Sequence, residues 1–214
     1  MILGMSMVKF FIPILLGSSR IGRKSLGVAR FIVEKLREHG RIHTELLDLA
    51  TYNLPIMEQR LQEMEQLPPG LREFSDKLRR ADGLLMVVPE YKNGYPGVLK
   101  NALDYLEAGI LQYKPVAICT VSSGEFGGLN CLAQLRLVCL ALGGVPIPGT
   151  LPVCRVQETF EVGGTARDAQ LAKRLEPFLE ELLWYVEAMV AQRMKTAGAT
   201  SRRGLILAAS AQRQ

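Results

Sequence analysis

The sequence predicts an α/β fold in which five parallel strands form one doubly wound sheet with helices on both faces. Short apolar runs alternate along the chain with longer stretches in which apolar residues recur every three or four positions. The apolar runs are nearly continuous, which is typical of strands covered on both faces. A chain of 214 residues that is 48% hydrophobic and 22% charged suits one such domain with a sizeable core.

Five segments are expected to be strands, because each is a short apolar run bounded by polar or turn-forming residues. They are residues 8–16, 42–49, 83–88, 116–121 and 145–153. The third segment, GLLMVV, is the most apolar and is expected at the centre of the sheet. The second is partly polar and the fifth is interrupted by prolines, so both are expected at edges.

The first apolar run also has features of a targeting segment, because one lysine, apolar residues and then small residues follow one another. The strand interpretation is preferred because the Gly-Ser loop that follows has a chemical use of its own. No other apolar run is long enough to span a bilayer, so no association with a membrane is expected.

Five segments are expected to be helices, because apolar residues recur in each at helical spacing. They are residues 25–39, 71–80, 96–107, 128–142 and 169–190. Gly40 is a typical helix-stop residue, and Pro96 suits a first helical turn. Residues 50–69 show no clean period and are expected to form an irregular connection. Residues 1–194 are therefore expected to be one domain, followed by a C-terminal tail over residues 195–214.

The charge balance favours small anionic partners over nucleic acid. The chain has 26 Lys and Arg against 21 Asp and Glu, and this net charge of +5 is spread along the sequence. Its four cysteines and two histidines lack the spacing of a zinc site, so no metal is expected. Free thiols suit a reducing, cytoplasmic location. His39 and His43 lie away from the loops described below, and no catalytic acid or base is expected.

Three loops are expected to form one site. In a doubly wound sheet, ligands bind beyond the carboxyl ends of the strands, near the point where the strand order reverses. The loops that follow the first, third and fourth predicted strands are all rich in small, polar or charged residues. We therefore take these three loops together.

The loop after the first strand reads GSSRIGRKS over residues 17–25. Small residues allow backbone N–H groups to approach an oxyanion, and the following helix adds the positive end of its dipole. Ser18 and Ser25 offer hydroxyls, while Arg20 and Arg23 offer guanidinium groups that pair with phosphate. The loop predicts a phosphate site, although it matches neither the P-loop nor the dinucleotide pattern. The alternative is a helix-capping turn with solvated arginines.

The loop after the third strand, PEYKNGYPG over residues 89–97, combines turn formers with aromatic and polar groups. Such a loop suits a flat heterocycle, because backbone N–H groups can reach ring heteroatoms and an aromatic side chain can cover an edge. The alternative is a surface turn in which Tyr91 and Tyr95 pack against the next helix. Asn101, on that helix, is a candidate to hold the loop in place.

The loop after the fourth strand, SSGEFGG over residues 122–128, has three glycines. This composition predicts a close approach of the backbone to a ligand. The alternative is a flexible turn before a helix. Elsewhere in the chain, Glu58, Glu63 and Glu65 are expected on a solvated face, and Trp184 is expected in the core or at an interface.

Together, GSSRIGRKS, PEYKNGYPGVLKNALDYL and SSGEFGG resemble the NADPH-dependent FMN reductase family, which includes quinone, azo-dye and chromate reductases. The likeness runs over roughly residues 8–150, with the three pieces in the right order and at the right strand ends. It implies an α/β flavodoxin-like three-layer fold with a five-stranded parallel sheet.

The resemblance also implies roles for individual residues. The FMN phosphate would be held by Ser18, Arg20, Arg23 and Ser25. The isoalloxazine ring would be lined by Pro89, Glu90, Tyr91, Lys92, Asn93 and Gly94. The far side of the ring would contact Ser123, Gly124, Gly127 and Gly128. Many members carry Asn or His where this chain has Lys92, whose amine would either stabilise the reduced flavin or point to solvent.

The implied activity is reduction of bound FMN by NADPH, followed by transfer to a small-molecule acceptor such as a quinone or an azo compound. The resemblance also implies a homodimer or homotetramer, with the last helix and the loop over residues 90–95 as expected contact surfaces. The alternatives are a flavodoxin-type electron carrier and a non-enzymatic flavin sensor. The carrier is disfavoured because flavodoxins are strongly acidic and this chain is not. Nothing in the chain suggests the output domain of a sensor.

Overall fold

The structure, a computed structural model, describes residues 9–159 and 169–211. Its middle layer is a parallel sheet with the strand order β4-β2-β5-β6-β7 (Leu46–Asp48, Ile14–Leu16, Leu84–Pro89, Pro115–Val121 and Val145–Pro146). Strand β8 (Leu151–Val153) pairs with the later half of β6. In terms of the five predicted strands this order is 2-1-3-4-5, which is the flavodoxin-like arrangement. The predicted five-stranded parallel sheet is therefore confirmed.

Two predicted strands are each divided into two pieces. The first consists of β1 (Phe10–Phe11) and β2, separated at Pro13, which has no N–H to donate. β1 pairs with β3 (Ile42–His43) and β2 with β4 in one continuous register. The fifth consists of β7 and β8, separated by residues 147–150. The second and fifth strands lie at the edges and β5 is central, as predicted, while residue 8 lies outside the described residues.

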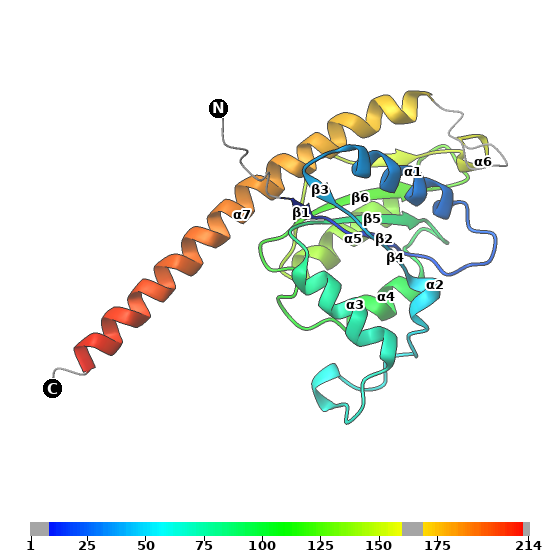
Figure 1. The fold of residues 1–214 in the computed structure, drawn as a ribbon. Coiled ribbons are helices and arrows are strands. Elements are labelled where there is room, and N and C mark those ends of the chain that lie inside the picture. The colour runs from blue at the N-terminus through cyan, green and yellow to red at the C-terminus, as the bar shows by residue number, and fades with distance from the viewer. Residues whose placement is uncertain (1–8, 160–168, 212–214) are drawn as a thin grey trace, which may run out of the picture.

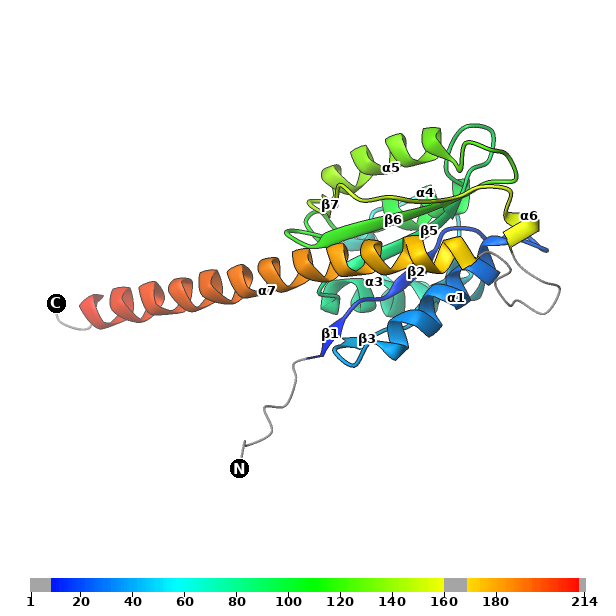
Figure 2. The ribbon, with the colours of Figure 1, turned by 90° about the horizontal axis from the view of Figure 1, so that it is seen from above.

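Helices cover both faces of the sheet, so that the molecule has three layers (Figures 1 and 2). One face carries α1 (Ser25–Glu38) and α7 (Ala169–Ala211), and the other carries α2 (Leu49–Tyr52), α3 (Pro69–Arg80), α4 (Gly97–Asp104) and α5 (Leu129–Ala141). Every residue of β5 and β6 is buried between these layers. The short turns η1 (Leu61–Glu63) and α6 (Val156–Thr159) lie in connections.

The last described segment of the chain is one long helix. Helix α7 continues to Ala211, so the boundary expected at residue 194 falls inside a helix. The continuation contains no proline and is rich in residues that suit helices. Figures 1 and 2 show that the C-terminal part of α7 extends well beyond the sheet. Trp184, on α7, is 64% exposed and so is not a core residue. No helix in the described ranges is both long and apolar enough to cross a membrane.

A buried lysine connects the sheet to the end of α3. Lys114 directly precedes β6, and its Nζ donates hydrogen bonds to the carbonyl oxygens of Leu78 and Arg79, each 2.7 Å away. These carbonyls belong to the last turn of α3, where the helix itself has no further N–H groups to bond the carbonyl oxygens. Burial lowers the pKa of Lys114 from 10.5 to about 8, and the nearby charge of Arg193 adds to the effect.

The free energy of unfolding is expected to gain a favourable contribution from Lys114 as the pH rises from about 8 to 10.5. In this range the unfolded chain still binds a proton that the folded chain has released, so raising the pH favours the folded state. Chemical denaturation of the wild type and of Lys114→Met should show the wild type gaining stability relative to the variant. Lys100→Met is the control, because a hydrogen bond to Asp104 raises the pKa of Lys100. Parallel pH curves for the wild type and Lys114→Met would contradict the assignment.

Candidate functional site

The three predicted loops lie at the carboxyl ends of neighbouring strands. They follow β2, β5 and β6, and β5 lies between the other two strands in the sheet. The loop after β5 is therefore flanked on both sides. Its first two residues, Glu90 and Tyr91, each contact one of the flanking segments.

Tyr91 joins the loop after β5 to the loop after β2. Its hydroxyl lies 2.8 Å from the Oγ of Ser18, a fully buried residue. The Nε of Arg20 donates to the same hydroxyl at 3.2 Å, and the guanidinium carbon lies 5.9 Å from the centre of the Tyr91 ring. The resemblance assigns Tyr91 to the flavin ring, whereas the structure directs its hydroxyl to two residues of the predicted phosphate site.

The N-terminus of α1 is open to an anion. Its N-cap residue, Lys24, makes no side-chain capping bond, and the first turn contains no acidic residue. Ser25 is 1% exposed, and its Oγ has no hydrogen-bond partner within the described residues. A buried hydroxyl without a partner is unfavourable unless a ligand supplies one. The first turn of α1 therefore suits a phosphate group, which accepts from backbone N–H groups and hydroxyls alike.

Arg23 is held by the protein itself. Its Nη2 pairs with Oδ2 of Asp48 at the end of β4, and both side chains are mostly buried. Its Nη1 donates to the Arg20 carbonyl at 3.4 Å, while its Nε is buried without a partner. Arg23 thus fixes the loop after β2 against β4. Sequence analysis did not single out Asp48. Its position between a strand and a short helix could have indicated it, because its side chain caps that helix by accepting from the Ala50 N–H.

Glu90 joins the loop after β5 to helix α5. Its backbone N–H donates to the Val121 carbonyl and so continues the pairing of β5 with β6. Its Oε2 accepts a hydrogen bond from the N–H of Cys131, 3.0 Å away in the first turn of α5. A carboxylate is favourable at this end of a helix. Burial, with the Glu90 charge adding to it, raises the pKa of Cys131 to about 12, so the thiol stays protonated at neutral pH.

Lys92 and Asn93 form a tight turn in the left-handed region, with φ of +51° and +64°. Tyr91 and Gly94 exchange backbone hydrogen bonds across them, as in a two-residue hairpin. A lysine in this conformation costs about 1–2 kcal/mol. The Nε2 of Gln134, on α5, donates to the Asn93 carbonyl and holds the turn. No feature of the sequence pointed to Gln134, which is an ordinary surface residue of a helix.

The loop after β6 ends in two glycines with positive φ, Gly127 at +61° and Gly128 at +84°. The Gly127 carbonyl accepts a hydrogen bond from the Thr120 Oγ1 at 2.6 Å. A Cβ placed on Gly127 would lie 2.5 Å from the Cβ of Pro152. The backbone here therefore requires glycine both for its conformation and for its close packing.

The first half of the same loop is attached to the segment that follows β8. Ser123 and Gly124 are exposed, and their carbonyls accept hydrogen bonds from the Gln157 side chain and the Arg155 N–H. Arg155 also pairs with Glu125. The hydrogen bonds and ion pairs found for the described residues join Ser123 to this segment and not to the other predicted site residues.

Gly127→Ala is expected to lower the free energy of unfolding by about 2 kcal/mol or more, because the left-handed conformation and the contact with Pro152 both penalise a Cβ. Gly124→Ala is the matched control in the same loop, since a Cβ there meets nothing within 4 Å. Urea denaturation of the flavin-free proteins measures both effects. Equal stabilities of the two variants would show that the backbone at residue 127 is not constrained as described.

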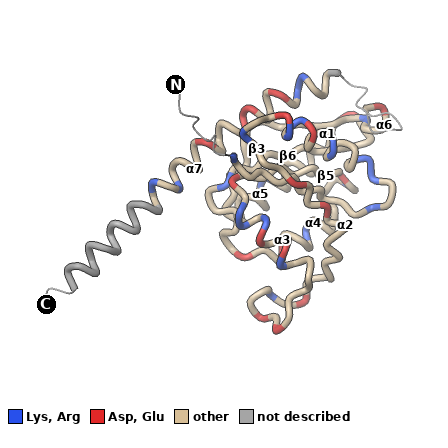
Figure 3. Tube along the Cα trace, viewed as in Figure 1, with Lys and Arg blue, Asp and Glu red and all other residues tan. Residues whose placement is uncertain are grey.

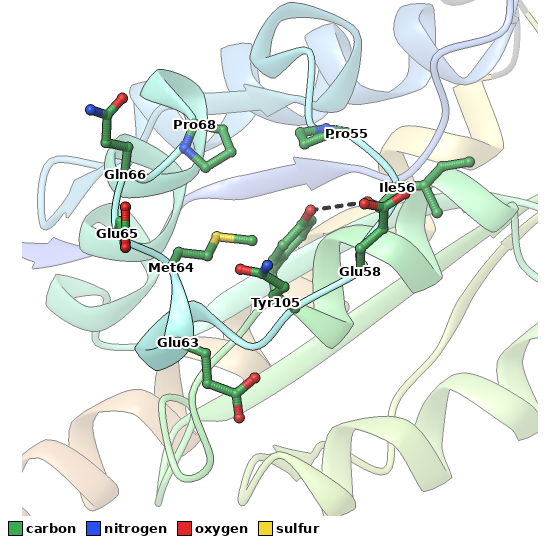
Figure 4. A pocket seen from close by; sticks show the side chains of 10 residues that line it. Pro55, Ile56, Glu58, Glu63, Met64, Glu65, Gln66, Pro68 and Tyr105 are labelled. Atoms are coloured by element: carbon green, nitrogen blue, oxygen red, sulfur yellow. Dashed lines mark hydrogen bonds between the residues drawn. The ribbon is translucent and has the colours of Figure 1, made fainter.

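A cavity of about 740 Å³ lies away from these loops, beside α4 (Figure 4). Residues between 55 and 68 line it together with Tyr105, and none of the predicted site residues does. Glu58, Glu63 and Glu65 are exposed, as predicted. Figure 4 shows their carboxylates on different sides of the cavity, so they do not form a converging set of acidic groups.

Asn101 holds the irregular connection and not the loop after β5. Its Nδ2 donates to the Pro55 carbonyl at 2.7 Å, and its Oδ1 accepts from the Met57 N–H at 2.8 Å. Asn101 lies one turn into α4, which carries it away from the loop at the start of that helix. The expectation that Asn101 fixes the loop after β5 is therefore wrong.

The sequence profile of the NADPH-dependent FMN reductase family matches residues 12–158, a range that includes all three loops. The chain belongs to this family. As a family member it is an NAD(P)H-dependent FMN oxidoreductase, and its cofactors are FMN and NADPH. The predicted family, cofactors and enzyme class are thereby confirmed.

Relatives of this FMN reductase agree with the assignment. An FMN-dependent NADPH-azoreductase of Staphylococcus aureus is 25% identical over 177 residues, covering 81% of this chain and 93% of the relative. The structure of FerB, a flavoenzyme NAD(P)H:(acceptor) oxidoreductase from Paracoccus denitrificans, has a TM-score of 0.69 and 26% identity over 84% of this chain and 98% of FerB. An NAD(P)H:quinone oxidoreductase from Methanothermobacter marburgensis shares the fold, with a TM-score of 0.55 and 18% identity over 80% of this chain and 96% of that one.

Proposed function

We propose that this FMN reductase takes a hydride from NADPH onto FMN held by the three loops, and reduces a small quinone, azo compound or similar acceptor. The observation that carries the cofactor site is the uncapped N-terminus of α1, where the Ser25 hydroxyl is buried without a partner. The names of the azoreductase and quinone oxidoreductase relatives support the class of acceptor. When bound, FMN supplies the two-electron chemistry, so the protein has to bind, orient and tune it.

The phosphate end is proposed to lie at the first turn of α1. Ser25 and Ser18 present hydroxyls there, and the exposed guanidinium of Arg20 balances the charge. Arg23 contributes its free Nε while its pairing with Asp48 keeps the loop in shape. The hydroxyl of Tyr91 links this end of the site to the ring end.

The ring end is proposed to lie between the turn of residues 91–94 and the glycines at the end of the loop after β6. Pro89 ends β5, and Glu90 fixes the turn to α5. Gly127 and Gly128 present backbone without side chains, which allows a flat ring to approach closely. The remaining residues proposed to line the ring are Tyr91, Lys92, Asn93, Gly94, Ser123 and Gly124.

Anaerobic titration tests the reaction directly. FMN-loaded protein mixed with NADPH is expected to lose its visible flavin absorbance rapidly, and a quinone or an azo dye added afterwards should restore it. Comparing the rates of restoration by the two acceptors identifies the preferred class. Bound FMN that NADPH leaves oxidised would overturn the reductase proposal in favour of an electron carrier.

Arg20→Ala is expected to weaken FMN binding by about 10- to 150-fold, because losing a charged contact to phosphate costs roughly 1.5–3 kcal/mol. Quenching of FMN fluorescence on binding gives the dissociation constant. Riboflavin, which lacks the phosphate, should bind the wild type and the variant equally. Arg37→Ala, at the opposite end of α1, is the control. An unchanged FMN affinity in Arg20→Ala would remove Arg20 from the phosphate site.

The proposal includes a cytoplasmic location and association into a homodimer or homotetramer, as the family resemblance implies. All four cysteines are free thiols, which supports a reducing compartment. Among the described helices, none fits a membrane span.

A further inference from the structure

The acidic residues of the three loops are already occupied by partners within the protein. The segments over residues 17–25, 90–96 and 122–128 contain two acidic residues, Glu90 and Glu125. The carboxylate of Glu90 is bound to the first turn of α5, and Glu125 pairs with Arg155. Neither carboxylate is therefore left to balance a positive charge on the loops.

The phosphate end of the site has enough positive charge for one phosphate group. The loop after β2 contains Arg20, Arg23 and Lys24, and Figure 3 shows basic but no acidic residues along it. Asp48 neutralises Arg23, which leaves the charges of Arg20 and Lys24. A phosphate monoester carries a charge of about −1.5 to −2 at pH 7. The phosphate of FMN would therefore balance both remaining cations.

Lys92 is the basic residue of the three loops that this balance leaves over. It is exposed, and its side chain has no hydrogen bond or ion pair with the described residues. Its φ of +51° is unfavourable for a residue with a Cβ, and asparagine tolerates such a conformation better than lysine does. Strained backbone of this kind is typical of functional sites. The side chain of Lys92 therefore calls for a functional explanation.

We propose that Lys92 binds an acidic group on the electron acceptor, so that the enzyme favours aromatic acceptors that carry a sulfonate or a carboxylate. The proposal rests on the function proposed above, in which the turn of residues 91–94 lines the flavin ring. Both sides of this turn are held in place, since Tyr91 bonds to Ser18 and the Asn93 carbonyl accepts from Gln134. The flexible four-carbon stem of Lys92 lets its ammonium group reach a substrate that lies on the ring.

The position of Lys92 favours the acceptor over NADPH as the source of the acidic group. In a quinone sulfonate or a carboxylated azo dye, the acid is attached directly to the ring system that takes up the electrons. In NADPH, a ribose separates the nicotinamide ring from the nearest phosphate. A side chain beside the flavin ring therefore lies closer to an acid on the reacting ring than to the phosphates of NADPH.

The contact with Lys92 is expected to strengthen binding without changing the rate of electron transfer. A quinone takes up a hydride from the reduced flavin and a proton from water and becomes a hydroquinone, while its sulfonate is unchanged. The ion pair between the ammonium group and the sulfonate is thus the same before and after the reaction. An interaction of this kind lowers the dissociation constant and leaves the limiting rate as it was.

Rapid mixing of the reduced enzyme with two acceptors tests the proposal. The FMN-loaded protein is reduced anaerobically with one equivalent of dithionite and mixed with a naphthoquinone or with its sulfonate. The return of flavin absorbance at several acceptor concentrations gives the dissociation constant and the limiting rate. Lys92→Gln is expected to raise the dissociation constant of the sulfonate roughly 3- to 10-fold, because an ion pair at the mouth of a site is partly exposed to water. The values for the parent naphthoquinone should not change.

Three further variants serve as controls. Lys9→Gln removes the same charge just before β1, at the amino ends of the strands, and should leave both acceptors unaffected. Lys92→Arg should keep the preference for the sulfonate. Lys92→Asn should lose it while raising the midpoint of thermal unfolding, because asparagine tolerates the left-handed conformation. This last variant keeps the proposal testable if Lys92→Gln does not fold.

The possible results separate the proposal from its alternatives. An unchanged dissociation constant for the sulfonate in Lys92→Gln, or equal weakening of both acceptors, would overturn the proposal. A limiting rate lowered with both acceptors would also overturn it, because Lys92 would then act on the flavin itself. A rise confined to the KM of NADPH would assign the contact to NADPH and not to the acceptor. Dithionite takes the place of NADPH in the main assay, so failure of reduction by NADPH is detected separately.

Discussion

The hydrogen bonds made by Glu90 and Tyr91 hold the candidate site together. Successive side chains at the end of a strand point to opposite faces of the sheet. In β5 the even-numbered residues Leu84, Met86 and Val88 face the layer of α5, and the odd-numbered residues face the layer of α1. Glu90 continues the first set and reaches α5, while Tyr91 continues the second and reaches Ser18. One dipeptide thus connects the loop after β5 to the loop after β2 on one side and to helix α5 on the other.

The same region contains features that reduce the stability of the protein on its own. The Oγ of Ser25 and the Nε of Arg23 are buried without partners, and Lys92 occupies a left-handed conformation. Natural sequences tolerate such features mainly at functional sites. Within the described residues, His39 and Ser75 also have a buried side-chain atom without a partner, but only the loop after β2 brings two such groups together, at the start of α1. The 740 Å³ cavity beside α4 is lined by no residue with these features.

Helix α5 takes part in the core and in the candidate site, and it also has an exposed side. Its inner side, with Cys131, Leu135 and Cys139, is part of the core beneath the sheet. Its N-terminus is tied to Glu90, and Gln134 holds the neighbouring turn. Its outer side is apolar as well, which a helix that served only to cover a sheet would not need. Helix α5 therefore connects the core to the loops of the candidate site.

The sequence by itself determined the order and type of the elements, because apolar spacing along the chain reflects which face each segment buries. It also located the three loops, since Gly127, Gly128 and the serines before α1 are local requirements of turns and helix starts. The family was identifiable from the same motifs, which lie at fixed positions after their strands.

Only the tertiary structure decided which side chains meet. The Tyr91 hydroxyl is hydrogen-bonded to Ser18, which lies 73 residues away in the chain, and Arg23 pairs with Asp48, 25 residues away. Asn101 bonds to residues 55 and 57 and not to the loop that precedes its helix. The exposure of Trp184 on α7, and of Leu129, Leu137 and Leu140 on α5, is likewise decided by packing. The spacing of apolar residues along a helix is the same whether or not a neighbouring layer covers them. Local pattern constrains the backbone of a segment, whereas these contacts depend on how the sheet places distant segments side by side.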